Sequence, residues 1–578
     1  MDDTILTDDS DDDLPFGEDH LDEFEPSDDD DPSLEPTTMS EESRPDILDS
    51  NESSSRRLLP VGYHKQFEQG LCEEMTNMVD EEFVVCSTSK LKTLFNDRFS
   101  DLKECCICGD VSKTTQTPIG GTMIFHRRCQ KGHVAAKFKT SWKVSNVYIA
   151  NLLMCSAVTM TGNNFTKVAM WAKFVKLVFP SITTFTRLQA AYVNPVVERF
   201  WGTTQEMMLS ALHGIPVDIC GDGRCDSPGF SAHYCQYVFQ EALAGYIVHL
   251  MTVDKRQVQG KSLTMERYGA FHGLAFLVSK IKIATFTTDD NPMVRSCFGD
   301  TEKSREKLKS NFPELTAAAI DAIQGIRHYL DTWHRTKKIG AALSKAGKGK
   351  SKVLDWVKPV VNHFWHCCQS CEGNVDTLRE SWLALLYHVQ GIHEWATGQC
   401  SHGPSDEENE ALRDGASVDT VRSVVTDKKL MKELHYYTGF HHTGPLENFN
   451  GLITMYASKR THFEYNTMLT RTKLAAIDYN HYIHRKVKKH DDRLVVTKGY
   501  SKGGARWVLR YKKEPKDYDY HRSSEYMLLL ERRDHPSRLK ARVELPPDHP
   551  KHIAPNIAPV QGITTADIVE KKKSRLGN

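Results

Sequence analysis

The stretch IPVDICGDGRCDSPGFSAHY, residues 215–234, decides how the central part of the chain is expected to fold. Its apolar first six residues predict a buried strand, and glycines, a proline and two aspartates follow them. Asp222 and Asp226 have two open roles, because aspartate beside glycine builds turns, whereas carboxylate oxygens are the ligands that Mg²⁺ prefers. The sequence predicts a strand that ends at Cys220 and presents carboxylates directly after it.

Beyond this stretch the chain alternates between strand and helix patterns. In chain order these are a hairpin (233–239 and 244–253), a helix (265–280), a second buried strand (281–288) and a third such segment (325–334). Alternation of this kind is typical of an α/β fold. We therefore expect an α/β core that starts near residue 210.

Three acidic residues share one context in this pattern. Asp222 follows the first strand, Asp289 follows the second, and Glu447 lies in the first turn of a predicted helix with Thr443 as its N-cap. Acids at strand ends converge in an α/β sheet, where two divalent cations about 4 Å apart can activate a water or a 3′-hydroxyl. Each acid also has an ordinary role, in a turn, at a helix N-terminus or against a helix dipole.

The charge of the 578-residue chain is divided unevenly. Residues 1–55 hold 22 Asp and Glu against one Arg, a charge of −21, so residues 56–578 carry +19 because the whole chain carries −2. A basic body with an acidic arm is typical of proteins that bind polyanions. The arm, 1–58, is expected to be disordered. No membrane span or signal peptide is visible, which predicts an intracellular protein.

Fifteen cysteines in such a chain indicate thiols and metal ligands rather than disulfides. Cys105-x-x-Cys108 is answered by Cys129-x-x-x-His133 across a glycine-rich hairpin pattern, which is the paired spacing of a tetrahedral zinc site. Cys106 and His126 are spare candidates. Some of these cysteines being simply buried is the alternative.

A second cysteine and histidine cluster lies further along the chain. The residues that could hold a second zinc ion there are Cys368, Cys371, Cys400 and His402. Buried cysteines without metal explain the same pattern equally well.

Taken together, the phrases of residues 83–480 resemble a family of DNA transposases. In chain order they are FVVCSTSKLKTLF, CQKGH, DGRCDSPGFSAHY, TTDDN, DTWHRTK, CSHGP, HTGPLENFNGLITMYASKRTHFEY and MLTRTKLAAIDYNHY. Together they look like the Kolobok-type cut-and-paste transposases. The resemblance implies a ribonuclease H-like mixed sheet, interrupted by an α-helical insertion before the last acid of a catalytic Asp-Asp-Glu (DDE) triad.

On this resemblance the triad falls on Asp222, Asp289 and Glu447, with Mg²⁺ or Mn²⁺ as its cofactor. Asp331 and His334 match an auxiliary motif near the third strand, where His334 would position Glu447 or contact a DNA phosphate. Asp226 is then left to build the turn. DNA is the expected partner, self-association into a homo-oligomer is left open, and the nucleus is the expected location.

Two departures from the family keep a second function open. No THAP-type zinc domain for end recognition is visible, and the second motif reads TTDDN where relatives often have a basic residue and a histidine after the aspartate. The leading hypothesis is DNA strand cleavage and transfer. The alternative is a domesticated, transposase-derived DNA-binding or regulatory protein without catalysis, and a nuclease without a transfer step is a third hypothesis.

The expected organisation has seven parts. They are an acidic arm (1–58), a zinc-ribbon-like module (80–140), a helical DNA-binding candidate (141–205), the first part of the core (210–337), a helical insertion (338–437), the completion of the core with the catalytic glutamate helix (438–490) and a basic, partly disordered C-terminal region (491–578).

Overall fold

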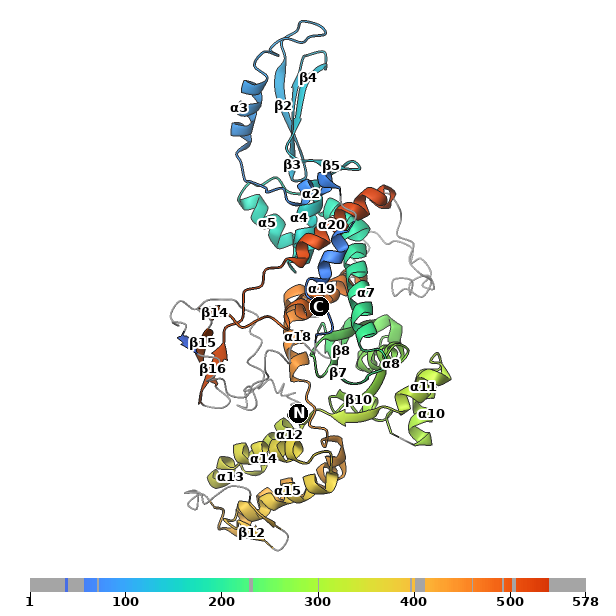
Figure 1. Cartoon of the computed structure of the whole chain (residues 1–578), viewed down its shortest axis with the longest axis vertical. Coiled ribbons are helices and arrows are strands. Elements are labelled where there is room, and N and C mark those ends of the chain that lie inside the picture. Colours follow the sequence, from blue (N-terminus) through green and yellow to red (C-terminus); the bar gives the residue numbers. More distant parts are fainter. Residues whose placement is uncertain are drawn as a thin grey trace, which may run out of the picture.

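A computed structural model of the chain shows an elongated mixed α/β protein (Figure 1). A small sheet with helix α3 (Thr88–Arg98) stands at one end, and the central sheet lies in the middle. The helices from α12 (Thr332–Ala346) to α15 (Val375–His388) form the other end. The described residues are 37–39, 57–69, 72–227, 232–299, 301–395, 398–400, 411–459, 461–490, 493–501 and 506–539. Most of the acidic arm, His402 and residues 540–578 lie outside them.

The central sheet has five strands in the order β11-β10-β7-β8-β9. Strands β7, β8 and β9 form an antiparallel meander, and β10 and β11 lie parallel to β7. The bounds are β7 (Pro216–Cys225), β8 (Tyr234–Glu241), β9 (Ile247–Asp254), β10 (Lys282–Thr288) and β11 (Arg327–Leu330). Every residue of β8 is buried, which agrees with its central place between two strands.

Strand β7 corrects the expectation that the first strand ends at Cys220. It continues to Cys225, because residues 219–225 pair with residues 235–241 of β8. The two glycines in this continuation allow close packing. A Cβ at Gly221 would lie 2.6 Å from Phe286 Cζ, and one at Gly223 would lie 2.6 Å from Glu266 Cγ. Asp222 is therefore a strand residue rather than a turn residue.

Helices surround the sheet and share one hydrophobic core with it. Helix α8 (Met265–Val278) packs on β8 and β9, and α7 (Asn194–Ala211) and α19 (Tyr465–Tyr482) also contact β9. The core extends to α4 (Ile149–Met160) and α20 (Tyr520–Asp534). The predicted helical segment 141–205 and part of the C-terminal region thus belong to the body of the protein.

Shorter elements complete this body. They are η3 (Tyr63–Glu68), α2 (Glu73–Val79), β5 (Lys143–Val144), β6 (Val147–Tyr148), α5 (Phe165–Phe174), α6 (Ile182–Leu188), the π-helical turn η4 (Gln189–Val193), η6 (Lys255–Val258), η7 (Ser262–Thr264), α9 (Pro292–Arg295), α10 (Glu302–Asn311), α11 (Ala317–Gln324) and η10 (Pro536–Leu539). A separate sheet joins β1 (Thr37–Met39), β14 (Lys489–His490), β15 (Arg493–Ser501) and β16 (Arg506–Tyr511).

The N-terminal module has its own small core. Helix α3 (Thr88–Arg98) packs Phe95 against an antiparallel sheet of β2 (Lys113–Ile119), β3 (Thr122–Arg128) and β4 (Val134–Lys139). Residues 105–108 lie in the loop before β2, and residues 129–133 join β3 to β4. The sheet therefore brings the two predicted ligand pairs to one end.

A helical insertion leaves the sheet after β11 and returns at α18 (Gly444–Tyr456). Its elements are α12 (Thr332–Ala346), α13 (Ser351–Asp355), α14 (Val357–Ser370), α15 (Val375–His388), a hairpin of β12 (Glu394–Trp395) and β13 (Gly398–Gln399), α16 (Gly415–Val425), α17 (Lys428–Glu433) and η9 (Leu434–Tyr436). Their apolar faces meet in a second core around the fully buried Trp382. In the part of the chain that the structure describes, no helix is both long and apolar enough to cross a membrane.

Candidate functional site

Three aspartates lie side by side where the pairing of the parallel strands ends. Thr288, the last residue of β10, pairs with Gly221 on β7 and with Leu330 on β11. The residue that comes after each of these three positions is an aspartate, namely Asp222, Asp289 and Asp331. The backbone amide of Asp331 donates to the Thr288 carbonyl at 2.9 Å, which carries the pairing one residue past the strand. The parallel register thus gathers acids from three strands.

Asp331 is the N-cap of α12 and is fully occupied by hydrogen bonds. Its Oδ1 accepts from the Trp333 amide at 2.7 Å, and its Oδ2 accepts from His334 Nδ1 at 2.7 Å and from the Thr443 hydroxyl. Although burial opposes ionisation, the bonds from His334 and Thr443 hold the pKa of Asp331 below its usual value. Asp331 therefore orients His334 and ties α12 to the start of α18.

His334 stands between the acids of two different segments. Its Nδ1 lies 3.0 Å from Asp289 Oδ1, and its Nε2 lies 3.7 Å from Glu447 Oε1. The ligand atoms of Asp289, Asp331 and His334 all lie within 4.8 Å of one another. Burial favours the neutral ring, but Asp331, Asp289 and Glu447 together raise the pKa of His334. The histidine links the second aspartate to the glutamate that returns after the insertion.

Helix α18 also reaches the first aspartate. The Asn450 side-chain amide donates to Asp222 Oδ2 at 2.7 Å, and the Gly223 amide lies 2.8 Å from Asp222 Oδ1. Asn450 follows Glu447 by three residues, so both lie on one face of the helix. The sequence did not lead us to predict Asn450. Its position three residues after the predicted glutamate is the only feature of the sequence that indicates its role.

The clustered acids repel one another in a poorly solvated place. Burial, followed by the charge of Asp222, raises the pKa of Asp289 to about 7, and burial raises the pKa values of Asp222 and Glu447. Asp289 Oδ1 is closed off from solvent, and no described group donates a hydrogen bond to it, because the Nδ1 proton of His334 goes to Asp331. A buried carboxylate oxygen without a hydrogen-bond donor fits a divalent cation.

The neighbouring Asp290 has a different task. Arg295 Nη1 lies 2.7 Å and Lys338 Nζ 3.1 Å from its two carboxylate oxygens, and Arg295 also pairs with Glu433 at 2.8 Å. Burial opposes ionisation, but Lys338 and Arg295 hold the pKa of Asp290 below its usual value. Asp290 therefore joins the core to the insertion, and Asp289 is the acid that faces the cluster.

A cleft of approximately 530 Å³ opens beside Asp289. Glu266, at the start of α8, lines it, and burial raises the pKa of Glu266 to about 7. Glu266 packs against Gly223, where the missing Cβ leaves room for it. Sequence reasoning missed Glu266, because nothing in its own helix pattern separates it from a solvent-facing glutamate. The cleft gives a ligand access to Asp289 and His334.

Asp226 serves the loop that joins β7 to β8. Its Oδ1 accepts hydrogen bonds from the backbone amides of His233 at 3.0 Å and Tyr234 at 3.2 Å. The turn role predicted for Asp226 is confirmed by these bonds. Asp222 remains the acid of this stretch that lies beside Asp289.

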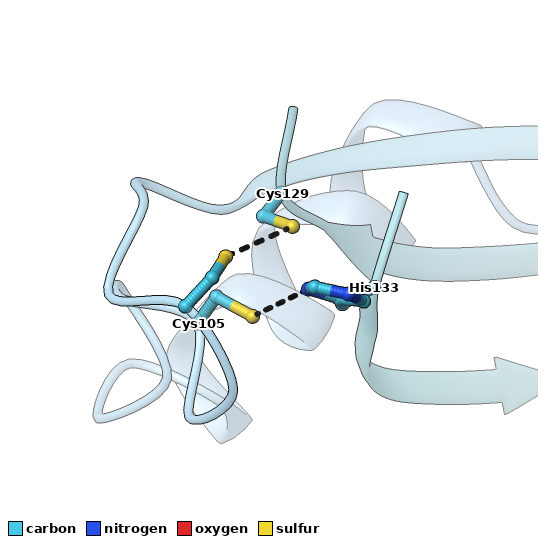
Figure 2. Close-up of side chains that lie close together, drawn as sticks. Cys105, Cys129 and His133 are labelled. Carbon is cyan, nitrogen blue, oxygen red and sulfur yellow. Dashed lines mark hydrogen bonds between the residues drawn. The ribbon is translucent and has the colours of Figure 1, made fainter. Parts of the chain in front are cut away.

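The N-terminal module gathers Cys105, Cys108, Cys129 and His133, whose ligand atoms all lie within 4.8 Å of one another. Cys105 Sγ lies 3.7 Å from His133 Nδ1, and the sulfurs of Cys108 and Cys129 are 3.6 Å apart (Figure 2). Zinc bond lengths of about 2.3 Å to sulfur and about 2.0 Å to nitrogen give tetrahedral edges of about 3.5–3.8 Å. The four side chains therefore have the geometry of a zinc site, and the spare candidates Cys106 and His126 lie outside this group.

The cysteines of the insertion are arranged differently from the expected set. Cys368 and Cys371 are buried in the core of the insertion, where the Cys371 thiol donates to the carbonyls of Cys368 at 3.3 Å and Thr438 at 3.5 Å. Cys400 groups instead with His388 and His393. His402 lies outside the described residues.

The described residues form two kinds of candidate metal centre. One is an acidic cluster where the pairing of the parallel strands ends in a mixed α/β core, and the other is a Cys₃His group on a small N-terminal sheet. Neither protein-family models nor curated proteins match this chain. The function is therefore inferred from the residues and geometry of these two centres.

Proposed function

We propose that the protein cleaves and transfers DNA strands by a metal-dependent DDE mechanism, in a ribonuclease H-like core of the Kolobok transposase type. The observation that carries this proposal is the alignment of Asp222 and Asp289 on neighbouring parallel strands, with Glu447 brought 3.7 Å from His334 by α18. Glu447 follows Asp222 by 225 positions in the chain. Helix α18 therefore brings an acid from far along the chain to the part of the sheet that carries Asp222 and Asp289.

The sheet order supports the ribonuclease H-like part of the proposal. A three-stranded antiparallel meander, β7-β8-β9, is extended on the β7 side by two strands parallel to β7. The last acid then returns on a helix after the insertion, as the resemblance implies. Both features agree with an interrupted core of this kind.

The acids would supply the oxygen ligands of the metal ions. Asp222, Asp289 and Glu447 offer carboxylates whose pKa values are raised mainly by burial, against the opposing charge of His334. When bound, Mg²⁺ or Mn²⁺ would activate the attacking hydroxyl and stabilise the leaving oxygen. The chain itself fixes the ligands, since Asn450 holds Asp222 and the Asp331–His334 pair lies against Asp289 and Glu447.

Cationic groups near the acids suit a phosphate backbone. Lys337 lies on α12 with its Nζ 3.0 Å from the centre of the Trp333 ring, and Glu447 is among the charges that act on it. The charge of +19 on residues 56–578 adds a general attraction to DNA. We propose DNA as the partner and the nucleus as the location on these grounds.

A plasmid cleavage assay tests this function. Supercoiled plasmid is incubated with Mg²⁺ or with EDTA, and the products are the nicked and linear forms. The unmodified chain should cleave only with Mg²⁺, and Asp222→Asn, Asp289→Asn and Glu447→Gln should each lose this activity. Asp218→Asn is the matched control, because Asp218 also lies on β7 but accepts from Thr285, and it should retain cleavage.

The same assay separates the alternative function. If the unmodified chain binds DNA but never cleaves it with Mg²⁺ or Mn²⁺, the domesticated regulator becomes the better explanation. If cleavage persists in all three triad variants, the assignment of the acids is wrong.

A further inference from the structure

A second group of cysteine and histidine side chains lies at the far end of the insertion. The ligand atoms of His388, His393 and Cys400 lie within 4.8 Å of one another. His388 is the last residue of α15, His393 precedes β12, and Cys400 follows β13. One of the three side chains therefore comes from the end of a helix, and the other two flank the open end of one β-hairpin.

The hairpin geometry explains how two of these residues meet. Glu394 pairs with Gln399 and Trp395 with Gly398, so the residues flanking these pairs face each other. The backbone confirms this, since the Cys400 amide donates to the His393 carbonyl at 2.9 Å. Strands of two residues are too short to hold a hairpin by their own ladder. A cross-link at its base would supply the missing constraint.

The hairpin is also laid against α15. The rings of Tyr387 and Trp395 stack with centroids 5.5 Å apart and an angle of 5° between their planes. This contact directs the base of the hairpin toward His388, whose Nδ1 lies 3.5 Å from Cys400 Sγ. For one zinc ion with bonds of about 2.3 Å to sulfur and about 2.0 Å to nitrogen, the tetrahedral S–N edge is about 3.5 Å. The observed separation is that of two ligands on one ion.

We propose that His388, His393 and Cys400 bind a zinc ion that fixes the β12–β13 hairpin to the end of α15. The donor set of two imidazoles and one thiolate suits Zn²⁺ and leaves one coordination position for water or a further ligand. Burial raises the pKa of the Cys400 thiol in the metal-free chain, and a coordinated cation removes that proton. This centre is independent of the acidic cluster and of the proposed DNA chemistry.

The proposed ligands differ from the set that the sequence pattern predicted. The sequence pattern grouped Cys400 with Cys368 and Cys371, but those thiols face the core of the insertion, and Cys371 donates to the Thr438 carbonyl. The core packing uses these two cysteines as apolar side chains. Only Cys400 of the three lies beside histidines in the described residues.

Zinc stoichiometry of the purified full-length chain tests the proposal. Inductively coupled plasma mass spectrometry should find two zinc ions per chain, one of them at Cys105, Cys108, Cys129 and His133. Cys400→Ser and His388→Gln should each lower the value to one. Two matched controls should keep it at two: His366→Gln, an exposed histidine on α14, and Cys371→Ser.

The remaining zinc ion reports on folding. A variant that keeps one ion at the N-terminal module, with an unchanged far-ultraviolet circular dichroism spectrum, has lost the insertion site alone. If Cys400→Ser, His393→Gln and His388→Gln all retain two ions, the proposed site is wrong. If Cys371→Ser loses an ion and His388→Gln does not, the ligands are those of the sequence pattern and the proposal also fails.

Discussion

The imidazole of His334 donates through Nδ1 to the carboxylate of Asp331 at 2.7 Å, which leaves its Nε2 facing Glu447. This relationship exists because α12 begins at Thr332. Residues three apart at a helix N-terminus lie on one side, whereas on an extended strand they would face opposite sides. Asp331 is thus a positioning residue for the histidine.

Replacing Asp331 by Asn should reduce Mg²⁺-dependent cleavage by about 10–100-fold, the usual cost of losing an outer partner of a metal site. The amide cannot hold the His334 ring as an anion does, so the alkaline limb of the pH–rate profile should also shift. A loss of thermal stability with an unchanged profile would indicate a structural role only. Asp218→Asn serves again as the control.

Neutralising Asp289 should stabilise the metal-free protein. The folded-state pKa of Asp289, about 7, lies above the ordinary value of 3.8. The folding stability that its protonated carboxyl contributes is therefore fully present below about pH 4 and is lost as the pH rises through about 7. At pH 8 without Mg²⁺, Asp289→Asn should therefore raise Tm, and Mg²⁺ should stabilise this variant less than the unmodified chain. A lower Tm of the metal-free variant would contradict repulsion among the acids. Differential scanning fluorimetry measures both.

Asn450→Ala should weaken metal binding more than it slows turnover. It removes the donor to Asp222 Oδ2, and the Mg²⁺ concentration for half-maximal cleavage should rise by about 10–100-fold. Met455→Ala, an exposed position on the same helix, should leave the Mg²⁺ dependence unchanged. Equal Mg²⁺ curves for Asn450→Ala and the unmodified chain would show that Asn450 does not support the site.

Acid should unfold the core partly through two buried histidines. Burial lowers the pKa values of His249 and His328 to about 3, so the stability they contribute as neutral rings is present above about pH 6.5 and is lost as the pH falls toward 3. His328→Gln keeps a partner for the Thr288 hydroxyl but cannot be protonated. The free energy of unfolding of His328→Gln should fall less steeply between pH 6 and 4 than that of the unmodified chain. The two slopes should differ by up to ~1.4 kcal/mol per pH unit. Parallel curves in urea titrations would exclude this role.

The sequence was most informative where the pattern is local. The strand over 281–288 and the helix over 265–280 agree with β10 and α8 within two residues. The extension of β7 was missed because Gly221 and Gly223 look like turn residues, although they are there to admit Phe286 and Glu266.

The support around the acids could not be predicted, since it depends on distant packing. Asn450 and Glu266 acquire their roles only when α18 and α8 meet the end of β7. Helix α20 falls in the region predicted to be basic and partly disordered (491–578), because its many charged residues mask the apolar side chains, such as Leu528, that enter the main core.

Strand transfer itself is the most direct test of the proposed DDE chemistry. A labelled duplex oligonucleotide with a free 3′-hydroxyl end is incubated with unlabelled plasmid, Mg²⁺ and the full-length chain, and covalent label on the plasmid is measured after denaturation. We expect Mg²⁺-dependent label with the unmodified chain and with Asp218→Asn, and none with Glu447→Gln, although Glu447→Gln should still bind the oligonucleotide. Equal transfer by Glu447→Gln and the unmodified chain would contradict the proposed chemistry.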